Sequence, residues 1–131
     1  MTQASLLRRI IFAFHIEFVN WYLSSNLNNE ILPNIQDYCL LSGVFNNTMP
    51  DNITFMKETL KKMFDASNKG IAFNALSTYV DYQDKDLYYS NPVEIFDFCK
   101  TTLGNKVVLR HEYQTKPNVM PFEYTVYVYK D

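Results

Sequence analysis

Residues 6–23, LLRRIIFAFHIEFVNWYL, form a long and almost entirely apolar stretch. Its apolar residues recur at steps of three and four, which is the period of an α-helix. Ser5 can cap the first turn, and the polar residues 24–26 end the pattern. We therefore expect a helix over residues 6–23, around which the rest of the chain packs. The residues that carry this periodicity are Leu6, Leu7, Ile10, Ile11, Phe14, Phe18, Trp21 and Tyr22.

A helix that is apolar around most of its circumference is buried on several sides or spans a membrane. His15 and Glu17 lie in the middle of this stretch and argue against a membrane span, which needs roughly 20 mostly apolar residues. The stretch also lacks the small-residue cleavage site of a signal peptide. A core helix is the expected outcome, and burial in a partner or homo-oligomer interface is the alternative.

The composition predicts one domain over residues 1–131, in a cytoplasmic protein. The chain has 131 residues, a length that buries enough surface to fold alone. Its net charge of −2 argues against nonspecific nucleic-acid binding. Cys39 and Cys99 have no metal-ligand spacing, so we expect buried free thiols. We read the glycosylation sequons at Asn46 and Asn52 as chance occurrences.

Three further helices are expected downstream of the first. Residues 34–42 fit a short helix closed by Gly43, and residues 52–68 form the clearest amphipathic pattern, with a cap at Asp51 or Asn52. Asn91 followed by Pro92 and Glu94 is a strong start signal for a helix over residues 92–103.

Residues 71–82 are ambiguous between a helix and a strand. Ala72, Ala75, Leu76 and Tyr79 fit a helical period, whereas the alternation that begins at Ile71 fits a strand. We predict a helix here. A strand would instead extend the C-terminal hairpin into a three-stranded sheet.

The hydrophobic period changes from 3.6 to 2 near the C-terminus. Residues 107–113 and 122–130 read as strands that pair as an antiparallel hairpin. In the second strand, Tyr124, Val126 and Val128 share one face, and Tyr127 and Tyr129 share the other. The predicted fold class is therefore α+β, with four to five helices followed by a C-terminal antiparallel β-hairpin in a single compact domain.

No enzyme motif stands out. Nucleophilic catalysis needs a nucleophile, a base and an orienting group, and the two histidines, His15 and His111, lie in an apolar stretch and a strand. No phosphate-binding glycine loop and no clustered metal ligands occur, so we expect no catalytic residues, no metal and no cofactor.

The order of three helices and a terminal hairpin also matches a winged helix-turn-helix. In that fold the helix over residues 92–103 would enter the DNA major groove. It carries Glu94 and Asp97 against Lys100, and the wing offers Lys116. This charge pattern argues against DNA, so a winged-helix regulator is an alternative, as is a small structural subunit of a larger, even viral, assembly.

Residues 79–98 combine acidic and aromatic side chains and have a net charge of −4. Tyrosine is a favoured interface anchor because it combines a large area with a polar tip, and carboxylates would steer it onto a basic partner. The acidic surface predicted to bind that partner comprises Tyr82, Asp84, Asp86, Tyr88 and Tyr89.

The tetrapeptide from Asp86 to Tyr89 resembles the acid-then-Tyr-Tyr element of the colicin nuclease immunity proteins. The predicted hairpin has no place in that all-helical family, so no relationship is inferred. The sequence nevertheless favours a non-catalytic protein-binding domain. Its most concrete form is an immunity- or antitoxin-like inhibitor that blocks a basic partner, such as a nuclease toxin.

Overall fold

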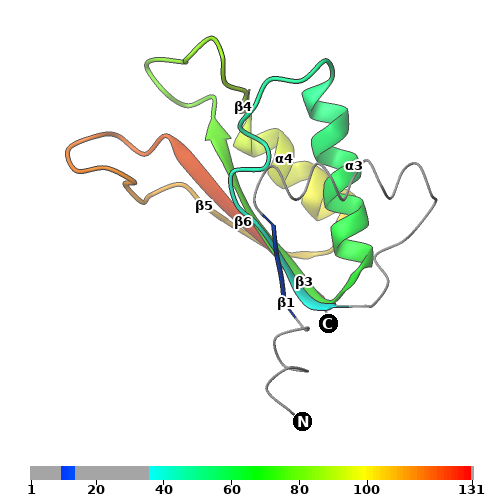
Figure 1. Ribbon diagram of the computed structural model, residues 1–131. Coiled ribbons are helices and arrows are strands. Elements are labelled where there is room, and N and C mark those ends of the chain that lie inside the picture. Colours follow the sequence, from blue (N-terminus) through cyan, green and yellow to red (C-terminus); the bar gives the residue numbers. More distant parts are fainter. Residues whose placement is uncertain (1–9, 14–35, 131) are drawn as a thin grey trace.

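The computed structural model describes residues 10–13 and 36–130. Over these residues the chain forms a mixed β-sheet with two α-helices on one face (Figure 1). The strands are β1 (Ile10–Ala13), β2 (Gln36–Leu41), β3 (Ser67–Ser77), β4 (Tyr89–Ser90), β5 (Lys106–Arg110) and β6 (Glu123–Tyr129). The helices are α3 (Asn52–Asp65) and α4 (Pro92–Phe98), and α4 continues into a π-helical turn, η1 (Cys99–Leu103).

Five strands lie in the order β1-β2-β3-β6-β5, and the short β4 pairs with the end of β3. The pairings β1–β2, β2–β3 and β3–β4 are parallel, whereas β6 is antiparallel to both β3 and β5. Helix α3 forms the crossover between the parallel strands β2 and β3, which a tight turn cannot connect.

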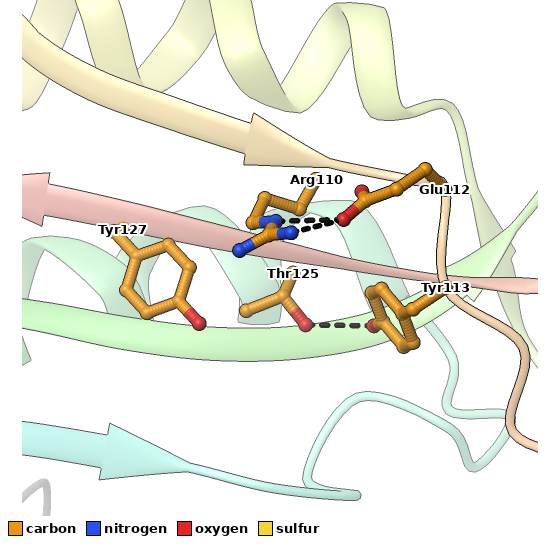
Figure 2. Close-up of a pocket in the computed structure, with 5 residues that line it drawn as sticks. All are labelled: Arg110, Glu112, Tyr113, Thr125 and Tyr127. Atoms are coloured by element: carbon orange, nitrogen blue, oxygen red, sulfur yellow. Dashed lines mark hydrogen bonds and ion pairs between the residues drawn. The ribbon is translucent and has the colours of Figure 1, made fainter.

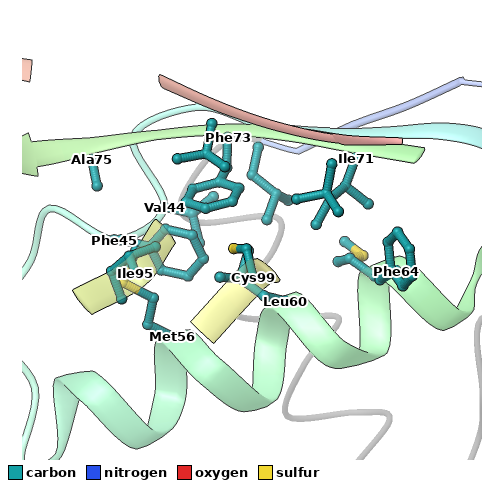
Figure 3. Packing of buried hydrophobic residues seen from close by; sticks show 14 of the residues in the cluster. Val44, Phe45, Met56, Leu60, Phe64, Ile71, Phe73, Ala75, Ile95 and Cys99 are labelled. Atoms are coloured by element: carbon teal, nitrogen blue, oxygen red, sulfur yellow. The ribbon is translucent and has the colours of Figure 1, made fainter. Parts of the chain in front are cut away.

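The core lies between the sheet and the two helices (Figure 3). Alternate residues of β3 and β6 point toward the helices, where Leu60 of α3 and Ile95 of α4 are fully buried. Phe45 stands edge-on to Phe55 and Phe73, with ring centroids 6.1 and 5.9 Å apart. Each large side chain buried in this way stabilises the fold by roughly 1.5–3 kcal/mol.

Both helices start where the sequence predicts. Asp51 caps α3 by accepting a hydrogen bond from the Thr54 amide, and Asn91 caps α4 by accepting one from the Val93 amide. The predicted C-terminal hairpin is β5 paired with β6, and Tyr124, Val126 and Val128 are buried together on one face. The prediction that both cysteines are buried free thiols is also confirmed.

The predicted fold class is wrong, because strands replace three of the expected helices over the described residues. Residues 36–41 form β2, whose apolar residues 38–41 suit a parallel strand paired on both sides. Residues 67–77 form β3, which is hydrogen-bonded on both sides, and this tertiary pairing overrides the helical spacing of its alanines. The strand alternative for residues 71–82 is the one that the structure adopts, up to Ser77.

The expected helix over residues 6–23 is wrong where the structure describes it. Ile10–Ala13 is strand β1, which pairs in parallel with β2. An apolar run without polar interruptions cannot by itself distinguish a buried helix from a buried strand. The rest of that stretch lies outside the described residues.

We expect Gly70→Ala to destabilise the protein by about 2–4 kcal/mol, because the sheet must open to admit a methyl group. Gly70 has a φ of +150°, and a Cβ there would lie 2.4 Å from the backbone oxygen of Val128 on β6. Gly43→Ala is the control, since Gly43 has a φ of +70° but no atom within 4 Å of that position. It should cost about 1–2 kcal/mol from backbone strain alone. Urea unfolding measures both, and equal losses would contradict the close packing of β3 against β6.

We expect the two buried thiols to lower the stability of the protein at alkaline pH. Burial raises the pKa of Cys39 to about 11 and that of Cys99 to about 12. Because an exposed thiol ionises near pH 8.5, the unfolded chain releases protons that the folded chain keeps. The free energy of unfolding should therefore fall above that pH, by up to about 1.4 kcal/mol per pH unit for each thiol.

Urea titrations at a series of pH values from neutral to alkaline measure this slope. The double variant Cys39→Ala, Cys99→Ala should show a flatter profile than the wild type, whatever its stability at neutral pH. Identical slopes would show that other groups cause the alkaline loss.

Candidate functional site

Strands β1, β2, β3 and β5 run in the same direction and end at the same edge of the sheet. The loops that follow β2, β3 and β5 cover residues 42–50, 78–88 and 111–122. Figure 1 shows the loop after β3 extending beyond the arrowhead of that strand. In open α/β sheets, ligands bind outside the carboxyl ends of the strands. This carboxyl edge is therefore the candidate functional site.

Asn74 of β3 holds the turn that follows β2. Its Oδ1 accepts a hydrogen bond from the Gly43 amide at 2.9 Å, and its Nδ2 donates one to Ser42 Oγ at 3.1 Å. Gly43 adopts the left-handed conformation, and the space beside its Cα is open. Asn74 thus fixes the turn, and the open space beside Gly43 leaves room for a ligand to approach the backbone closely.

The loop after β2 is joined to the loop after β3. The Tyr88 amide donates to the Asn46 carbonyl at 2.9 Å, Asn47 and Leu87 form an isolated β-bridge, and Thr48 Oγ1 donates to the Asp86 carbonyl at 3.2 Å. These contacts make the two loops one wall of the carboxyl edge.

The side-chain oxygen of Asn46 is buried and has no hydrogen-bond partner among the described residues. An unpaired buried acceptor costs about 1–3 kcal/mol, so such an atom in a native structure needs an explanation. Unlike the fully buried Ser77 and Tyr124, Asn46 as a whole residue is half-buried in a loop at the carboxyl edge, so a turn of its side chain would present Oδ1 to a ligand. Sequence analysis missed Asn46, because the strand that leads to it was read as a helix.

The five residues of the predicted acidic surface all lie in or next to the loop after β3. Tyr82 is 75% exposed, whereas Tyr88 and Tyr89 are half-buried. Asp84 accepts a hydrogen bond from the Asp86 amide at 2.9 Å, and the Asp84 amide donates to the Tyr89 hydroxyl at 3.0 Å. Asp84, Asp86 and Tyr89 therefore shape the loop from within.

A polar cluster joins the ends of β3, β4, β5 and β6, with Ser77, Ser90 and Tyr124 buried and His111 half-buried. His111 Nε2 lies 2.6 Å from Ser77 Oγ, and the Tyr124 hydroxyl lies 2.5 Å from Ser90 Oγ. The His111 ring packs between the rings of Tyr79 and Tyr124, at centroid distances of 6.5 and 6.3 Å. Only the pairing of β3 with β6 and of β6 with β5 brings these residues together, so no local pattern could have revealed the cluster.

This cluster is a support for the edge and does not supply a nucleophile. Ser77 and Tyr124 are completely buried, so no substrate can reach their hydroxyl groups. Burial also raises the pKa of Tyr124 far above its ordinary value, which keeps the phenol protonated.

On the other face of the sheet, a pocket of about 330 Å³ opens at the carboxyl end of β5 (Figure 2). It is lined by Arg110, Glu112, Tyr113, Thr125 and Tyr127. The described ranges, 10–13 and 36–130, contain no group of three potential metal ligands. Within the same ranges, no helix has the length and hydropathy needed to cross a bilayer.

Comparison with known proteins finds a curated relative. Over 100 residues the chain is 34% identical to a Mycobacterium tuberculosis protein named "Putative methyltransferase", and the match covers 72% of this chain. The chain spans 57% of that relative's length. No protein-family model matches the chain, and no solved structure gives a significant match.

This relative overturns the expectation of a non-catalytic immunity-like inhibitor. Its name denotes an enzyme, so the match points to catalysis rather than to blocking a basic partner. Sequence analysis did not predict an enzyme, because the described residues of the carboxyl edge carry no familiar catalytic motif.

Tyr124→Phe tests the polar cluster. The substitution leaves the buried Ser90 hydroxyl with one long contact, 3.4 Å to the Leu76 carbonyl. We expect a loss of about 1–3 kcal/mol in the free energy of unfolding, measured by urea titration. Tyr113→Phe removes a 2.7 Å contact with Thr125 that is partly open to water, and this control should cost less than about 1 kcal/mol. Equal costs would argue against a cluster that supports the edge.

Proposed function

We propose that the chain is the whole or a part of a methyltransferase, which moves a methyl group from a sulfonium donor to a nucleophilic atom of an acceptor. The observation that carries this proposal is the 34% identity over 100 residues to a protein named for that activity. The fold supports it, because parallel strands end together at an edge suited to ligand binding.

The residues at the carboxyl edge fit a donor such as S-adenosylmethionine. Its ribose hydroxyls and its amino group are hydrogen-bond donors, and the buried Asn46 Oδ1 is an acceptor without a described partner. The open space beside Gly43 allows the donor to approach the chain closely. When bound, the donor supplies an electrophilic methyl group.

The chain's own contribution is to position the two reactants and to keep the edge rigid. Asn74 fixes the turn at Ser42 and Gly43, and the Tyr88–Asn46 hydrogen bond joins the two loops. Such positioning lowers the activation barrier of a reaction between two molecules, because the entropy of bringing them together is lost on binding and not in the chemical step.

Asn46→Leu separates donor binding from stability. The leucine removes the unpaired acceptor, so the free energy of unfolding should stay the same or rise by up to about 1 kcal/mol. Donor affinity, measured by titration calorimetry with S-adenosylmethionine, should fall about tenfold with the loss of one hydrogen bond of roughly 1.4 kcal/mol.

Asn47→Leu is the matched control, since its exposed side chain makes no described hydrogen bond and it neighbours Asn46 in the same loop. It should bind the donor like the wild type. A wild-type chain that does not bind S-adenosylmethionine would overturn the proposed function. If Asn46→Leu binds S-adenosylmethionine as tightly as the wild type, the donor is correct but Asn46 is not part of its site.

A further inference from the structure

The pocket in Figure 2 lies on the face of the sheet opposite α3 and α4. The start of the loop after β5 contributes Glu112 and Tyr113 to its lining, whereas the loops after β2 and β3 do not line it. Arg110 and Thr125 face each other across β5 and β6, and Tyr127 is the next residue on the same face of β6. Figure 2 shows the rings of Tyr127 and Tyr113 on either side of Arg110 and Thr125. The volume of the pocket, about 330 Å³, is at the lower end of the range for small-molecule sites.

The charged pair in the pocket has hydrogen-bonding capacity to spare. The Nε and Nη2 atoms of Arg110 both donate to the same oxygen, Oε1 of Glu112, and the Nε distance is 2.8 Å. A guanidinium group carries five N–H donors and a carboxylate has two oxygens. The remaining Arg110 donors therefore stay available to a ligand, and the Glu112 carboxylate beside them is an acceptor that the backbone amides of His111 and Glu112 also approach.

The charges also define which ligands the pocket disfavours. The hydrogen bond from Arg110 lowers the pKa of Glu112, so both groups are ionised at neutral pH and their charges cancel. An anion attracted by Arg110 would meet the carboxylate of Glu112, and a cation would meet the guanidinium. A neutral ligand avoids both conflicts.

Aromatic surface completes the pocket. The Tyr127 ring lies parallel to the ring of Tyr129, with 6° between the planes and 6.3 Å between the centroids. No described group bonds the Tyr127 hydroxyl. The negative face of an aromatic ring attracts polarised C–H groups, so Tyr127 offers a platform to a ligand with an apolar, C–H-rich face.

From these features we infer that the pocket binds a neutral sugar ring. A pyranose has a C–H-rich face for the tyrosine ring and adjacent hydroxyls that donate to Glu112 while accepting from Arg110. The inference does not depend on the proposed methyl transfer, because the pocket contains none of the residues assigned to the donor. Its test needs no methyl donor, so either proposal can fail alone.

The experiment titrates the isotope-labelled chain with three neutral probes and follows the backbone amide NMR signals. The probes are methyl β-D-glucopyranoside, methyl β-D-galactopyranoside and methyl α-D-mannopyranoside. At least one should shift the signals of Arg110, Thr125 and Tyr127, with a dissociation constant of about 1 mM as befits an open pocket.

Tyr127→Ala and Glu112→Ala should each weaken this binding about tenfold or more. Tyr82→Ala is the control, because this exposed tyrosine lies in the loop after β3 and neither lines the pocket nor stacks on Tyr127. It should change the affinity less than about twofold, and unchanged amide spectra elsewhere would show that all three variants fold. Three outcomes would each overturn the inference: no sugar shifts these signals, inorganic phosphate or benzoate binds there more tightly, or Tyr127→Ala binds like the wild type.

Discussion

Strand β3 is hydrogen-bonded along both of its edges, in parallel with β2 and antiparallel with β6. This pairing places Ile71, Phe73 and Ala75 against the helices, so the core forms only if the register is kept. A shift by one residue would turn these side chains to the opposite face. Gly70 contributes to the same constraint, since the β6 backbone passes too close to it for any side chain.

The same strand connects the fold to its candidate sites. From the middle of β3, Asn74 holds the turn after β2, and from its end Ser77 holds His111 after β5. The loops at the carboxyl edge are therefore attached to the best-supported strand of the sheet. The sugar pocket draws on β5, β6 and the start of the loop after β5 on the other face, and none of its residues is assigned to the methyl donor.

The predictable parts of the structure were those with local signals. Caps at Asp51 and Asn91 located the helices, and alternation from Tyr124 to Val128 located the last strand. Strand β2 carries no such signal, because its short apolar run gains strand character only from neighbours distant in the sequence. In β3 the alternation that begins at Ile71 competes with a helical spacing, and the pairing with β2 and β6 decides between them. Asn46, His111 and Ser77 were missed for the same reason, since their roles depend on which strands lie side by side.

The most direct test of the central claim is a map of amide NMR shifts on addition of S-adenosylmethionine to the intact chain. A donor site at the carboxyl edge predicts that the largest shifts fall in residues 42–47 and 77–79, with little change at the opposite edge around Gly70 and Lys130. Shifts concentrated at that opposite edge, or no shifts at all, would contradict the assignment of the carboxyl edge as a methyl-donor site.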